Sequence, residues 1–225
     1  MRTIAASKSG HPVFWTSLVG VLLTVAIVAM YLAPTEQTMG DAQRVMYVHI
    51  AVAWLALLGF VAMAACGLGY LLSRKLCWDQ WSQAVCEVGW LCSTLTLVTG
   101  SLWAHAAWGT WWTWDPRLVT SFILWAFYSG NLILRSGLED TYQRARLGAV
   151  LAIIGFADVP LVVMATRWFR GIHPVSPEME PSMRYALLAS VVGLTAVMAI
   201  LLVRRRTQLQ LELRVAELQM LADER

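Results

Sequence analysis

Charged side chains are scarce in this chain of 225 residues: they make up 14% of it, against roughly a quarter in a typical soluble domain. Hydrophobic residues account for 58%. A water-soluble protein of this size could not bury so much apolar surface in one core. A soluble enzyme, a disordered chain and a disulfide-stapled secreted domain are therefore excluded. The composition indicates an all-α, polytopic integral membrane protein.

Paired cysteines are also lacking. The four cysteines form no Cys-x-x-Cys pair and no Cys-x-x-Cys-His haem-attachment sequence, so the chain is not expected to be a thiol oxidoreductase or a c-type cytochrome. Structural roles are expected for all four, because free cysteine packs as a small hydrophobic residue. The net charge of +3 is too small to indicate a nucleic-acid partner. A cleavable signal is not expected, since the short polar start leads directly into a full-length apolar run.

Six apolar runs are long enough to cross a hydrocarbon core of about 30 Å, which takes about 20 helical residues. They form one predicted membrane domain over residues 1–203, with spans at 14–33, 47–72, 83–104, 117–137, 147–169 and 183–203. Residues 204–225 form a basic tail, which we expect to be helical because Leu211, Val215 and Leu218 recur at helical spacing. A surface helix, against lipid or a partner, and a solvated stop-transfer tail are both compatible with this pattern.

The distribution of lysine and arginine predicts the orientation of the spans. Of the 17 basic residues, only five flank the loops 34–46, 105–116 and 170–182: Arg44, Arg117, Arg167, Arg170 and Arg184. The other 12 lie near the two termini and the two remaining loops. Since basic residues concentrate on the cytoplasmic side, both termini are predicted to be cytoplasmic and the three sparsely charged loops to face outward.

The second outward loop, over residues 103–117, has an unusual composition. Five of the 12 tryptophans fall in the run Trp103-Ala-His-Ala-Ala-Trp108-Gly-Thr-Trp111-Trp112-Thr-Trp114-Asp115-Pro116-Arg117. Tryptophan is common at membrane interfaces, and an interfacial aromatic belt would account for two of them. Five in one loop favour the alternative, which is a platform for a large, flat, apolar ligand.

Three of the four histidines are predicted to lie on the same side as these tryptophans: His49, His105 and His173. A metalloporphyrin needs aromatic surfaces for its faces, imidazoles for its iron and cations for its propionates. Arg44 and Arg117 lie beside His49 and the tryptophan loop and could supply the cations. A histidine taken alone is more often just a polar loop residue, but the convergence of these three with the tryptophans favours a haem site.

The tryptophan run also carries a family resemblance. Residues Trp108-Gly-Thr-Trp-Trp-Thr-Trp-Asp-Pro-Arg117 resemble the tryptophan-rich (WWD) signature of the haem-handling protein family, and the whole chain resembles its component C branch, from System I cytochrome c maturation. Three further stretches match, namely Arg44-Val-Met-Tyr-Val-His49 with Ala53-Trp54, Val98-Thr-Gly-Ser-Leu-Trp103 and Arg170-Gly-Ile-His173-Pro. The absence of proline after His49 and the Asp115-Pro116 pair, which is similar to the related synthase branch, are departures from the component C pattern.

The resemblance implies a protein without ordinary enzymatic turnover that holds haem b non-covalently and transiently at its outer face. By similarity, His49 and His173 would be the axial iron ligands. The platform would comprise Trp108, Trp111, Trp112, Trp114 and Asp115, with Trp103 leading into it and with Arg44 and Arg117 near the propionates.

The resemblance further implies a multi-pass protein of the bacterial inner membrane whose haem site faces the periplasm. It would deliver haem to a membrane-anchored haem chaperone, alongside an ABC transporter ATPase and permease and a small single-span subunit. Two alternatives are a haem-attaching subunit of a cytochrome c synthase and a permease for haem or another solute. The synthase branch typically has more spans and histidines within the membrane, and a permease would need a polar path, for which Asp158 is the one candidate at depth.

Overall fold

A computed structural model of the chain describes residues 12–37, 40–171, 173 and 179–223. The described part is all-α, since its β-type pairing is confined to an isolated bridge between Glu36 and Gly40. Six helical stretches in it are long and apolar enough to cross a membrane. The prediction of an all-α protein with six spans is thereby confirmed.

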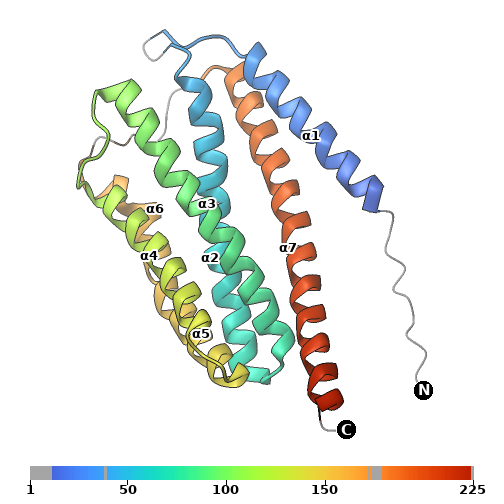
Figure 1. Ribbon diagram of the computed structural model, residues 1–225. Coiled ribbons are helices and arrows are strands. Elements are labelled where there is room, and N and C mark those ends of the chain that lie inside the picture. The colour runs from blue at the N-terminus through green and yellow to red at the C-terminus, as the bar shows by residue number, and fades with distance from the viewer. Residues whose placement is uncertain (1–11, 38–39, 172, 174–178, 224–225) are drawn as a thin grey trace.

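The helices form a bundle around a central pair (Figure 1). In chain order they are α1 (Pro12–Leu32), α2 (Gln43–Ser73), α3 (Leu76–Trp108), α4 (Pro116–Ser136), α5 (Thr141–Phe156), α6 (Asp158–Trp168) and α7 (Pro181–Asp223). Helices α2 and α3 make the most extensive contact, while α4, α5 and α6 lie on one side of them and α7 and α1 on the other. We call the end that carries the 109–115 connection the tryptophan end, and the opposite end the tail end.

Two helix caps fix the connection between α3 and α4. Helix α3 ends at Trp108 because Gly109 takes a left-handed conformation with a φ of 70°, which glycine adopts without steric cost. Helix α4 begins after Asp115, whose side chain accepts hydrogen bonds from the backbone N–H groups of Arg117 and Leu118. Pro116 occupies the first helical turn, where no N–H is needed. The tryptophan-rich connection is thus held at both ends.

Small residues allow the central helices to approach each other closely. The Tyr128 hydroxyl of α4 donates a hydrogen bond of 2.8 Å to the Ala56 carbonyl oxygen of α2. A Cβ atom at Gly89 of α3 would lie 2.4 Å from that same hydroxyl oxygen, so only glycine fits there. Close packing of this kind stabilises the association of membrane helices, because apolar lipid provides no hydrophobic driving force for it.

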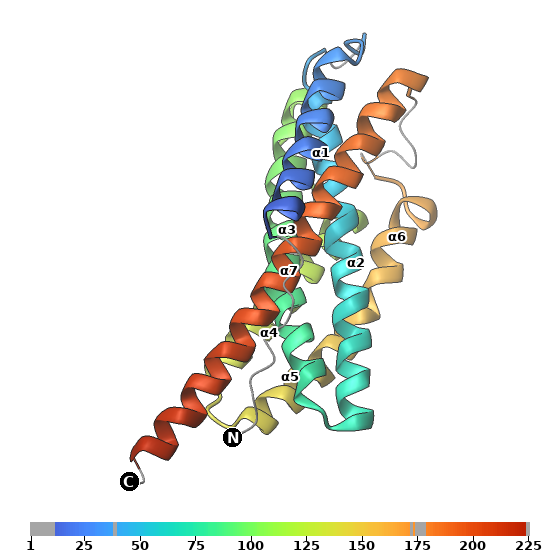
Figure 2. The ribbon, with the colours of Figure 1, turned by 90° about the vertical axis from the view of Figure 1, so that its right-hand side faces the viewer.

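The predicted fifth span, residues 147–169, is divided into α5 and α6. The break falls at Ala157, three residues before Pro160, which has no N–H for the carbonyl four residues earlier. The Oδ2 atom of Asp158 at this break is buried and has no hydrogen-bond partner. By contrast, α7 runs without interruption from Pro181 to Asp223 and projects beyond the rest of the bundle at the tail end (Figure 2).

A buried ionic network joins three helices near the tail end. Arg135 Nη2 of α4 donates to Asp79 Oδ1 of α3 at 2.8 Å, and Arg135 Nε donates to Asn131 Oδ1 at 2.8 Å. Asn131 in turn donates to the Gly148 carbonyl oxygen of α5 at 2.9 Å. The side chains of Arg135 and Asp79 are only 4% and 7% exposed, so each charge depends on the other for compensation.

We expect Asp79→Ala to lower the free energy of unfolding by about 3–5 kcal/mol, because it leaves the Arg135 guanidinium buried without its counter-ion. Thermal unfolding in detergent, followed by tryptophan fluorescence, measures the change. The control is Glu87→Ala, also on α3, whose carboxylate pairs with Arg205 but is 29% exposed. That partly exposed pair is expected to contribute about 1 kcal/mol or less. Equal losses in the two variants would contradict this account of the Asp79 pair.

Candidate functional site

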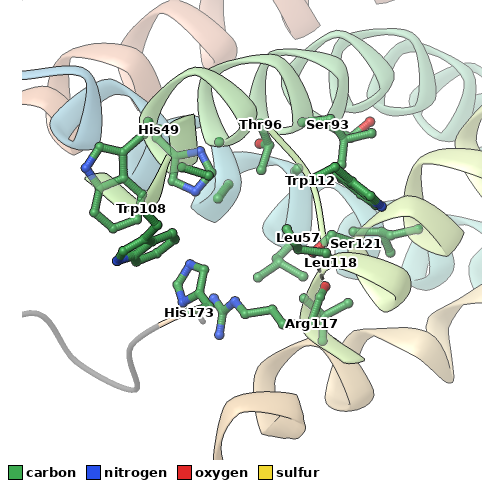
Figure 3. Close-up of a pocket in the computed structure, with 18 residues that line it drawn as sticks. His49, Leu57, Ser93, Thr96, Trp108, Trp112, Arg117, Leu118, Ser121 and His173 are labelled. Atoms are coloured by element: carbon green, nitrogen blue, oxygen red, sulfur yellow. Dashed lines mark hydrogen bonds between the residues drawn. The ribbon is translucent and has the colours of Figure 1, made fainter. Parts of the chain in front are cut away.

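A pocket lies at the tryptophan end, between α2, α3, α4 and α6 (Figure 3). Six side chains with ring or guanidinium groups line it: His49, Trp103, Trp108, Trp112, Arg117 and His173. Its deeper wall combines aliphatic and hydroxyl side chains, among them Leu57, Ser93, Thr96 and Ser121. The pocket therefore has an apolar lining with a few polar groups directed into it, as is typical of sites for organic ligands and cofactors.

His49 projects from the second turn of α2 toward α3. Its Nδ1 atom lies 3.1 Å from the Thr99 hydroxyl oxygen. The ring also lies against Gly100, where a Cβ atom would come within 2.8 Å of His49 Cε1. A larger residue at position 100 would push the imidazole out of place, so this glycine makes room for the ring.

Trp103 lies near both histidines of the pocket. Its ring is buried, and its centroid lies 6.3 Å from that of His49 and 6.3 Å from that of His173. Trp108 packs edge-on against Trp103 with centroids 4.9 Å apart. His49 from α2 and His173 from the segment before α7 thus both lie close to one indole, although they are 124 positions apart in the sequence.

Two of the pocket indoles keep unused hydrogen-bond donors. The Nε1 atoms of Trp103 and Trp112 are buried and have no hydrogen-bond partner. Unpaired buried donors are costly and rare, which indicates that a ligand or ordered water satisfies them. A ligand with both an extended apolar surface and acceptor groups would fit this lining.

Arg117 supplies a positive charge to the pocket from the first turn of α4. Arg117 and His173 both lie close enough to the His49 ring to act on it electrostatically. A guanidinium beside two imidazoles can hold the carboxylate of a ligand while the imidazoles bind a metal.

The other predicted site residues of the loop lie outside the pocket lining. The side chains of Trp111 and Trp114 are 54% and 76% exposed. The Trp111 ring stacks on His105 with centroids 3.9 Å apart, and its carbonyl oxygen accepts a 2.6 Å hydrogen bond from Ser101. Both indoles are available at the surface of the tryptophan end rather than inside the pocket.

Asp115 and Arg44 make local structural contacts. Asp115 caps α4 and also lies against Gly171, where a Cβ atom would be 3.0 Å from the carboxyl carbon. The Arg44 guanidinium donates to Asp41 at 3.1 Å and lies 5.4 Å from the centre of the Tyr31 ring. Arg44 is therefore held toward the end of α1, whereas Arg117 lines the pocket.

Thr96 and Gly100 of α3 also line the pocket, although neither was a predicted site residue. Thr96, Gly100 and Trp103 recur at intervals of four and three residues, which places them on one face of a helix. This helical spacing, counted back from the predicted site residue Trp103, could have indicated Thr96 and Gly100. Thr99 lies in the stretch from Val98 to Trp103 that carries the family resemblance, but its contact with His49 could not be predicted because it depends on the packing of another helix.

Comparison with known proteins identifies the family of this chain. The family described as heme exporter protein C matches residues 2–221. A heme exporter protein C of Escherichia coli K12 is 29% identical over 87% of this chain and 82% of its own length. The Paracoccus denitrificans protein of the same name is 30% identical over 80% of this chain and 78% of its own length.

Two further relatives match this chain over a smaller share of their own length. The heme exporter protein C of Bradyrhizobium diazoefficiens is 32% identical over 68% of this chain, and the match spans 58% of that relative. A putative cytochrome c biosynthesis ccmC-like mitochondrial protein of Marchantia polymorpha is 31% identical over 71% of this chain and 69% of its own length. Because the family match extends over nearly the whole chain, this multi-pass membrane protein belongs to the heme exporter protein C family.

Proposed function

We propose that the protein binds haem reversibly in the pocket at its tryptophan end and passes it to a haem chaperone during c-type cytochrome biogenesis. The observation that carries this proposal is that His49 and His173 line one pocket beside the buried Trp103. The names of its relatives, which refer to haem export and cytochrome c biosynthesis, support the same function.

The ligand set favours haem over a bare metal ion. Within the described part of the chain, no group of three or more His, Cys, Asp and Glu side chains could hold a metal ion. A structural or catalytic zinc ion takes three or four protein ligands. Two imidazoles suffice for an iron atom whose other four ligands come from a porphyrin. His49 and His173 are accordingly assigned as the axial ligands.

The remaining pocket residues match the other parts of the haem molecule. Trp103, Trp108 and Trp112 offer apolar ring surfaces, and the unpaired Nε1 donors of Trp103 and Trp112 could meet polar groups of the ligand or bridging water. Arg117 is assigned to a propionate, for which a guanidinium is the preferred partner. Trp111 and Trp114 would extend the platform outward, to the surface where a chaperone can approach.

Haem binding requires the pocket to widen. The cavity volume is about 60 Å³, whereas small-molecule sites usually enclose roughly 300–1,000 Å³. A porphyrin would therefore separate the His173 side of the pocket from the α2–α3 side, with one edge of the ring left open. That open edge is where the chaperone would take up haem through its own histidine.

The position of the basic residues supports an orientation with the tryptophan end in the periplasm and the tail end in the cytoplasm of a bacterium. The haem b cargo would then be held at the outer face of the inner membrane. The ABC transporter ATPase and permease and the small single-span subunit are proposed as neighbours in the membrane. Arg44, which lies at this end but outside the pocket, would act in positioning the start of α2.

Removing the hydrogen-bond partner of a metal ligand typically lowers metal affinity 10–100-fold. We expect His173→Ala to lower haem retention on the purified protein by more than this, because it removes a metal ligand itself. The haem-to-protein ratio after size-exclusion chromatography measures the loss. The matched control is His105→Ala, since His105 lies at the same end but stacks on Trp111 outside the pocket. A normal ratio in His173→Ala would exclude His173 as a required ligand.

We expect Trp112→Leu to weaken haem binding roughly fivefold, because replacing an aromatic wall costs about 1 kcal/mol beyond the buried area. Trp114→Leu should have little effect on affinity, since Trp114 is 76% exposed and lies outside the pocket lining. Haem titration followed by quenching of tryptophan fluorescence gives both dissociation constants. The assignment of the inner indoles fails if Trp114→Leu costs as much as Trp112→Leu.

A further inference from the structure

The hydroxyl group of Thr99 lies within hydrogen-bond distance of His49 Nδ1, and the proposed function gives this contact no role. We propose that Thr99 is a positioning residue that holds His49 in the tautomer with the proton on Nδ1, so that Nε2 is presented to the haem iron. This inference rests on the proposed function, because it assumes that His49 is an axial ligand.

The hydrogen-bond network assigns the proton. The Thr99 hydroxyl lies 2.6 Å from the Leu95 carbonyl oxygen and 3.1 Å from His49 Nδ1. A threonine hydroxyl carries one hydrogen, and a carbonyl oxygen can only accept. The hydroxyl hydrogen therefore goes to Leu95, and Thr99 Oγ1 can only accept from His49. The proton between the two side chains belongs to Nδ1, which leaves the lone pair on Nε2.

The same stretch of α3 also fixes the plane of the imidazole. Gly100 contacts the Cε1 edge, and the Trp103 ring lies at 28° to the imidazole plane. Three residues of α3 therefore restrain the ring: Gly100 at its edge, Trp103 at its face and Thr99 at Nδ1. A metal-ligating histidine whose other nitrogen donates to a fixed acceptor is oriented by that bond and becomes a stronger electron donor to the metal.

The test is Thr99→Val, which keeps the branched shape and removes the hydroxyl. We expect haem affinity to fall about tenfold, the lower end of the range for losing the hydrogen-bond partner of a ligating histidine. We also expect the reduction potential of the bound haem to rise, since a weaker imidazole donor stabilises ferric iron less. Thr99→Ser, which restores the hydroxyl, should return both quantities toward those of the unaltered protein.

Thr195→Val is the matched control, because the Thr195 hydroxyl makes the same 2.6 Å bond to a carbonyl four residues earlier, on α7 and outside the pocket lining. It should leave the potential and the affinity unchanged. If Thr99→Val does not fold, as judged by circular dichroism, Thr99→Ala is measured in its place. An unchanged potential in the folded variant, or a serine variant that behaves like valine, overturns the proposal.

These outcomes differ from those that would overturn the proposed function. If the unaltered protein binds haem with a spectrum that depends on His49, while the Thr99 variants match it in potential and affinity, only the role of Thr99 fails. If the unaltered protein binds no haem after haem is added, the function itself fails.

Discussion

The carboxylate of Asp115 organises the tryptophan end of this protein. It accepts hydrogen bonds from the backbone N–H groups that begin α4, and it packs against Gly171 in the segment that leads to His173. One side chain thereby sets the start of α4, the direction of the loop before it and the distance to the segment that follows α6. Arg117, which faces the pocket, is placed by that cap, since it occupies the second position of the helix.

Helix α3 provides the rigid surface against which the site is assembled. It carries Thr99, Gly100 and Trp103 toward His49 and ends at Trp108, so one helix restrains the imidazole and supplies two pocket walls. Sites built on helices are held more precisely than sites built on loops. The opposite wall, which carries His173, is attached through a connecting segment.

The sequence predicted the parts of this arrangement that depend on composition and spacing. Six spans follow from hydropathy, and the tryptophan run led to Trp103, Trp108, Trp112 and Arg117, which do line one pocket with the two histidines. It could not separate these indoles from Trp111 and Trp114, because the turn after Gly109 decides which side chains point inward. The division of the fifth span at Ala157 and the contact of Thr99 with His49 likewise depend on packing between helices that are distant in sequence.

The central claim is that His49 and His173 bind one iron atom from opposite sides. Low-temperature electron paramagnetic resonance of the oxidised, haem-loaded protein tests it most directly, with the single variants His49→Ala and His173→Ala measured beside it. The account predicts a low-spin signal in the unaltered protein and its replacement by a high-spin signal in each variant that retains haem. A low-spin signal that persists in both single variants, or a high-spin signal in the unaltered protein, would contradict it.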